Sequence, residues 1–181
     1  MNLVSETKNI TKTKLEQRGN EFKIKAPVTG SVVLNNAVVA SFGDGSLRFF
    51  RQNQEPFEVK AHKGVILNMS SNGQSIYTGG DDGRFLKISS DGQINEIYNY
   101  GSQWVDCVAS TENHFACSSG KKAYLWANFD RKPLIIDNSS TVGGLSFDFN
   151  GNKLAVSSYG GVTVWQKGDR RWKSSRFVWK G

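Results

Sequence analysis

Short hydrophobic runs alternate with clusters of Gly, Asn and Asp along most of this chain. The clearest unit is SIYTGGDDGRFLKI (75–88), in which two strand-like runs flank an acidic turn that contains glycine. An Asp-Gly pair between apolar residues is typical of a β-hairpin, because glycine readily adopts the positive φ of a tight turn. The unit occurs three more times, as VVASFGDGSLRFF (38–50), FACSSGKKAYLW (115–126) and LAVSSYGGVTVW (154–165).

The hairpins recur at a nearly constant interval. They end at Phe50, Ile88, Trp126 and Trp165, at spacings of 38, 38 and 39 residues. Two further strand-like runs separate successive hairpins, at 56–61 and 64–70, 96–100 and 104–110, and 133–137 and 142–148. Four antiparallel strands in each period are the pattern of a β-propeller blade. We therefore predict an all-β propeller with four recognisable blades over residues 23–181.

The second repeat, AHKGVILNMSSNGQSIYTGGDDGRFLKI (61–88), resembles the WD40 repeat family, in particular its divergent bacterial-type members. In that family a His, a Ser or Thr, a turn Asp and a Trp form a hydrogen-bonded chain. The resemblance implies such a chain through His62, Thr78 and Asp82, with Ile88 at the position of the Trp. Because isoleucine cannot donate a hydrogen bond, we expect this series of hydrogen bonds to end at Thr78.

The two ends of the chain carry separate expectations. Residues 1–22 are polar, and we expect a flexible segment there. FVWKG (177–181) is similar to FEVKA (57–61), which precedes His62, so we expect residues 174–181 to begin a further blade of a truncated ring. WD40 rings usually have about seven blades. Four blades would form an open arc with two exposed edges, which favours self-association of open arcs.

Composition indicates a folded domain outside the membrane. Hydrophobic residues make up 38% of the chain and charged residues 22%, and the two cysteines do not make a disulfide framework. No apolar run has the length of a membrane span, and the first residues do not form a signal peptide. We expect a cytoplasmic location. The net charge of +7 adds a weak preference for anionic partners.

Three groups of residues raise the question of catalysis or metal binding. Asp81 and Asp82 could be a pair of metal-binding or catalytic carboxylates, but turn chemistry and a bond to His62 explain them better, since neighbouring turn residues point apart. Cys107, His114 and Cys117 could suggest zinc, with the cysteines facing each other across a hairpin. Buried thiols between blades are the favoured interpretation, because there is no fourth ligand. We expect no cofactor, no metal site and no enzyme activity.

Two stretches are candidate binding surfaces. In YNYGSQW (98–104), the residues Tyr98, Tyr100, Gln103 and Trp104 could anchor a partner protein, because exposed aromatic residues dominate binding energy. The alternative is that Tyr100 and Trp104 pack between blades. KGDRRWKSSRFVWKG (167–181) interleaves basic and aromatic residues, as nucleic-acid-binding surfaces do. Its alternative is a loop followed by an outer strand.

The function expected from these features is a non-catalytic scaffold for protein–protein interaction or complex assembly. The step from repeat fold to scaffold rests on the resemblance to the WD40 family. Two other functions remain open. One is binding of nucleic acid or an anionic surface through the basic C-terminal stretch, and the other is a ligand-binding or enzymatic propeller.

Overall fold

The computed structural model describes residues 11–127, 132–169 and 171–179 and contains four antiparallel sheets of four strands each. The first sheet contains β1 (Val28–Leu34), β2 (Ala37–Phe42), β3 (Ser46–Arg51) and β4 (Phe57–Lys60). The second contains β5 (Ile66–Ser71), β6 (Ser75–Gly80), β7 (Arg84–Ser89) and β8 (Ile94–Asn99). The third contains β9 (Cys107–Ser110), β10 (His114–Ser119), β11 (Lys122–Ala127) and β12 (Leu134–Asp137). The fourth contains β13 (Val142–Phe147), β14 (Lys153–Ser158), β15 (Gly161–Lys167) and β16 (Trp172–Val178).

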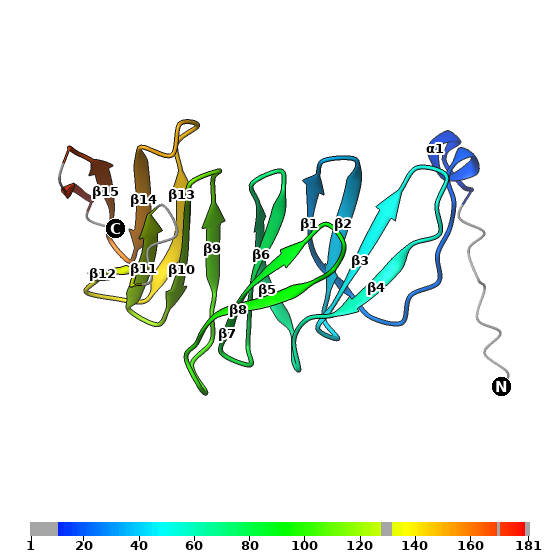
Figure 1. Cartoon of the computed structure of the whole chain (residues 1–181), viewed down its shortest axis with the longest axis horizontal. Helices are drawn as coiled ribbons and strands as arrows, with labels where there is room; N and C mark the ends of the chain where they lie inside the picture. The colour runs from blue at the N-terminus through cyan, green and yellow to red at the C-terminus, as the bar shows by residue number, and fades with distance from the viewer. Residues whose placement is uncertain (1–10, 128–131, 170, 180–181) are drawn as a thin grey trace, which may run out of the picture.

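The sheets stand side by side like the blades of a propeller (Figure 1). The first strands of successive sheets, β1, β5, β9 and β13, contact one another in chain order. The first and fourth sheets lie at opposite ends of the row, and the row does not close into a ring. The predicted all-β propeller architecture with four blades and an incomplete ring is therefore confirmed.

The turn between the second and third strands of every sheet contains a glycine with positive φ. These glycines are Gly45, Gly83, Gly120 and Gly160, with φ of 78°, 76°, 58° and 76°. Residues with a Cβ rarely adopt this conformation, so the Gly-containing clusters of the sequence place the four hairpins. The same end of each sheet carries the link to the next sheet, because a four-stranded antiparallel sheet returns its last strand to that end.

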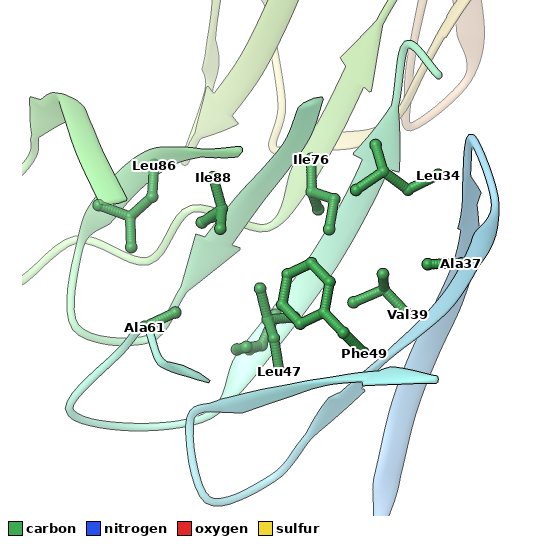
Figure 2. Close-up of a cluster of buried hydrophobic side chains, with 10 residues drawn as sticks. Leu34, Ala37, Val39, Leu47, Phe49, Ala61, Ile76, Leu86 and Ile88 are labelled. Carbon is green, nitrogen blue, oxygen red and sulfur yellow. The ribbon is translucent and has the colours of Figure 1, made fainter. Parts of the chain in front are cut away.

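Apolar side chains fill each of the three spaces between neighbouring sheets. Between the first and second sheets, Val39 and Phe49 meet Ile76 and Ile88, and all four are fully buried (Figure 2). A second cluster, which includes Tyr77, joins the second and third sheets, and another joins the third and fourth. Burial of apolar area in these spaces is the main contribution that holds the row together.

Both ends of the chain modify the sequence-based predictions. Within the predicted segment 1–22, residues 1–10 lie outside the described residues, and Lys14–Arg18 form the short helix α1. Thr13 caps this helix by accepting a hydrogen bond from the Glu16 amide. The expectation that residues 174–181 begin a further blade is corrected, because β16 pairs along its length with β15. The strand covers the free edge of β15, as β4, β8 and β12 do in their own sheets.

Candidate functional site

A buried histidine joins a link, a strand and a turn of the second sheet. His62 lies in the link before β5, Thr78 lies on β6, and Asp82 lies in the turn after β6. His62 Nδ1 is 2.8 Å from Asp82 Oδ1, and His62 Nε2 is 2.8 Å from Thr78 Oγ1. An ionised carboxylate can only accept, so Nδ1 carries the proton and Nε2 accepts from the Thr78 hydroxyl. Ile88, which lies on β7 and cannot donate a hydrogen bond to continue this group, is fully buried.

Burial and hydrogen bonding set the ionisation of this group. Burial lowers the pKa of His62 below its usual 6.5, and this outweighs the opposing attraction of the Asp82 carboxylate. Burial acts to raise the pKa of Asp82, but hydrogen bonds from His62 and from two backbone amides hold it below its usual value. At neutral pH the histidine is therefore neutral and the aspartate is charged, so the two form a structural hydrogen bond.

The Asp82 turn fixes the two links that flank it. Asp82 Oδ2 accepts a hydrogen bond from the Lys63 amide at 3.0 Å, which holds the link before β5. On the other side, Gly83 accepts from the Tyr100 amide at 2.8 Å and Gly80 accepts from the Val105 amide at 3.0 Å. The hydrogen-bonded residues of the second sheet thus position the link between β8 and β9.

The close approach of the two backbones explains the glycine at position 83. A Cβ on Gly83 would lie 2.1 Å from the carbonyl oxygen of Gly101. Such a contact is impossible without displacing the link, so only glycine lets the turn and the link meet. This requirement is additional to the positive φ of Gly83.

The four predicted partner-binding residues divide into exposed and packed side chains. Trp104 is 58% exposed and Tyr98 is 50% exposed, while Gln103 is exposed and accepts a long hydrogen bond from Ser119. Tyr100 is half-buried: its ring lies 4.6 Å from that of Tyr98, and its hydroxyl is 3.4 Å from a buried sulfur. The alternative of packing between blades therefore describes Tyr100, whereas Trp104 faces outward.

Further exposed aromatic residues lie at the same end of the sheets and were not among the predicted site residues. Tyr159 is in the turn between β14 and β15, and Trp179 follows β16. The Trp179 amide donates to the carbonyl of Gly160 in that turn, so both residues belong to the same end of the fourth sheet. The sequence signal that could have identified Tyr159 as exposed is its place in the turn SSYGG, where a polar residue is usual. We call this end of the row, with Trp104 and Tyr159, the aromatic rim.

The predicted cysteines are free and buried on adjacent strands. Cys107 is opposite Ser118, whereas Cys117 precedes Ser118 on β10 and points to the other face of the sheet. The suggestion that the two thiols face each other is therefore corrected. His114 packs against the ring of Trp172, near Lys167. Within the part of the chain that is described, no three His, Cys, Asp or Glu side chains are grouped to hold a metal ion.

Within β16, the basic residues of the C-terminal stretch do not all lie on one side of the sheet. In β16, Lys173 pairs with Gln166 and faces the open side of the fourth sheet. Arg176 pairs with Thr163, faces the other side, and donates to the Ser139 hydroxyl. The basic residues of the strand are thus divided between two faces. Among the described residues, no helix has the length and apolarity needed to cross a membrane.

Comparisons with known proteins identify the fold and leave the family open. No protein-family model matches the sequence, and no curated protein matches it significantly. One solved structure with the same fold is the crystal structure of the computationally designed Ika4 protein, with a TM-score of 0.67 and 20% identity. The match covers 83% of this chain and 99% of that chain. At this identity the similarity concerns the fold alone.

Proposed function

We propose that this chain is a WD40-like, non-catalytic scaffold that binds a partner protein at the aromatic rim. The observation that carries the proposal is the exposure of Trp104 on a link that buried hydrogen bonds hold in place. A large aromatic side chain on a rigid link loses little conformational entropy when a partner covers it. Tyr98 and Gln103 extend the same surface with a second aromatic ring and an amide.

Two features support the more specific parts of this proposal. His62, Thr78 and Asp82 are joined by hydrogen bonds. They are the kinds of residue, at the corresponding positions, that the resemblance to the WD40 repeat implies. The two unpaired, buried cysteines are typical of a protein from a reducing compartment, which favours the cytoplasm. The hydrogen bonds of His62 have a structural role, and this is the basis for proposing a scaffold in place of an enzyme.

The test compares aromatic residues from the two ends of the sheets. The tagged chain and its Trp104→Ala, Tyr98→Ala and Phe149→Ala variants would be used to capture proteins from an extract of the producing cells. Phe149 is a matched control because it is fully exposed in a turn at the opposite end of the fourth sheet. We expect a stoichiometric partner that is lost with Trp104→Ala, weakened with Tyr98→Ala and retained with Phe149→Ala. Equal recovery with all four chains would contradict the proposal.

A further inference from the structure

Each sheet has two faces, which differ in the neighbour they meet. We call the side that packs on the preceding sheet the rear face. It is marked in the second, third and fourth sheets by the cross-strand pairs Ile76–Ile88, Phe115–Trp126 and Leu154–Trp165. We call the opposite side, which packs on the following sheet, the forward face. In the third sheet it is marked by the fully buried pair Ala116–Leu125.

The forward face of the fourth sheet carries a group of apolar residues, with Lys153, Gln166 and Lys173 towards one end, and among the described residues no sheet packs on it. Its forward residues repeat those of the third sheet position by position: Ala155, Val162, Val164 and Phe177 occupy the register of Ala116, Ala123, Leu125 and Ile136. In the third sheet all four are fully buried against the fourth sheet. In the fourth sheet, Phe177 is 57% exposed. The fourth sheet thus carries the residues of an inter-sheet contact without the contact.

The first sheet has the complementary surface. Val38 and Phe50 pair across β2 and β3 in the register of Ile76–Ile88, on the rear face. Val38 is 49% exposed, and Val33, its partner on β1, is also exposed. The segment before β1 covers only part of this face, with the ring of Phe22 5.7 Å from that of Phe50.

Two charged residues of this rear face form an ion pair with each other. Arg48 and Glu58 are cross-strand neighbours, and the guanidinium Nη2 lies 2.8 Å from a Glu58 carboxylate oxygen. Because the two charges pair with each other, a sheet that packs over them does not leave either one without a partner. The guanidinium also lies over the ring of Phe42, 4.4 Å from its centroid, which adds a flat surface.

We propose that a second copy of this chain covers both end faces, with the forward face of each fourth sheet packed on the rear face of the other copy's first sheet. The occupant follows from complementarity, because the two end faces are the two halves of a contact that the chain already makes three times. Each copy supplies one forward face, on its fourth sheet, and one rear face, on its first sheet. Head-to-tail contacts of this kind close when two copies meet at both ends, and the two open arcs then form one ring. The inference does not depend on the proposed binding partner.

Three variants of the whole chain test this arrangement. Phe177→Glu places a charge on the forward face of the fourth sheet, and Val38→Glu places one on the rear face of the first. Ile135→Glu is the matched control, because Ile135 is an exposed apolar residue on the outer strand of an internal sheet. Sedimentation equilibrium over a range of concentrations gives the molar mass, and circular dichroism verifies that each variant keeps its β-structure.

We expect dimers of the unmodified chain and of Ile135→Glu, and monomers of the other two variants. A mixture of Phe177→Glu and Val38→Glu should form a weaker heterodimer, because one of the two contacts then joins two unmodified faces. This complementation separates a head-to-tail contact from one in which identical faces meet. A monomeric unmodified chain, or association that survives either end-face substitution, would overturn the proposal.

Discussion

The Nδ1 atom of His62 lies 2.8 Å from Oδ1 of Asp82, and this contact ties the link before β5 to the turn after β6. Replacement of Asp82 by Ala leaves the buried imidazole N–H without an acceptor and removes the bond to the Lys63 amide. We expect Asp82→Ala to lower the free energy of unfolding by about 1–3 kcal/mol. Urea denaturation followed by fluorescence measures this change.

The neighbouring residue provides a control for that measurement. Asp81 is in the same turn, but among the described residues its carboxylate makes no hydrogen bond. Asp81→Ala should therefore change the unfolding free energy much less than Asp82→Ala does. Equal losses in the two variants would mean that the turn's charge matters and that the bond to His62 does not.

The lowered pKa of His62 makes stability depend on pH. Since its pKa in the folded protein is below the usual 6.5, the unfolded chain binds the proton more readily. The stabilising contribution of neutral His62 is complete above about pH 6.5 and is lost as the pH falls below that value. We expect the unfolding free energy to decrease from pH 7 to pH 5, and His62→Gln to flatten this decrease by up to about 1.4 kcal/mol per pH unit.

An NMR titration of the histidine resonances separates His62 from His114, whose pKa burial and Lys167 also lower. His114→Gln serves as the matched variant, because it should remove a slope of the same sign while the His62 resonance continues to titrate below 6.5. A titration midpoint of His62 at or above that value would show that Asp82 outweighs burial.

Replacement by alanine should have different effects on stability at two glycines that meet at one contact. Both Gly83 and Gly101 have positive φ, but a Cβ on Gly101 meets no atom within 4 Å, whereas one on Gly83 meets the Gly101 carbonyl. Gly101→Ala should cost only the backbone strain, about 1–2 kcal/mol. Gly83→Ala should cost more and should also shift the fluorescence of Trp104 by moving its link. Similar losses in both variants, with no change at Trp104, would argue against the tight contact.

The two thiols should be unreactive in the folded protein. Both cysteines are buried, and burial raises the pKa of each thiol, so little thiolate is present at neutral pH. We expect slow alkylation by iodoacetamide at pH 8 and rapid modification of both residues in urea, as measured by intact mass. Fast labelling of one cysteine without denaturant would indicate local opening between the second and third sheets, or between the third and fourth.

The sequence predicts the repeated hairpins well, because Gly in each turn and apolar alternation beside it are local requirements. The positions of His62, Thr78 and Asp82 follow from the resemblance of the second repeat to WD40 repeats, and the structure brings these side chains within hydrogen-bond distance of one another. The expectation that residues 174–181 begin a further blade differs from the structure, in which β16 is the outer strand of the fourth sheet. Its residues look like those before His62, and an outer strand contains no local signal for the sheet whose edge it covers. The different exposure of Tyr100 and Trp104 depends on packing across sheets, which the spacing of aromatic residues does not encode.

Among the described residues, the main contacts between sheets join neighbours in the row, so unfolding should be cooperative mainly between adjacent sheets, as in a repeat protein. Detachment of the first or the fourth sheet exposes one inter-sheet surface, whereas unfolding of the second or third exposes two. A single copy should therefore lose structure from its ends inward, with the slowest amide exchange in β6 and β10 and faster exchange in β4 and β16. A second copy that covers both ends would convert this graded unfolding into one cooperative transition.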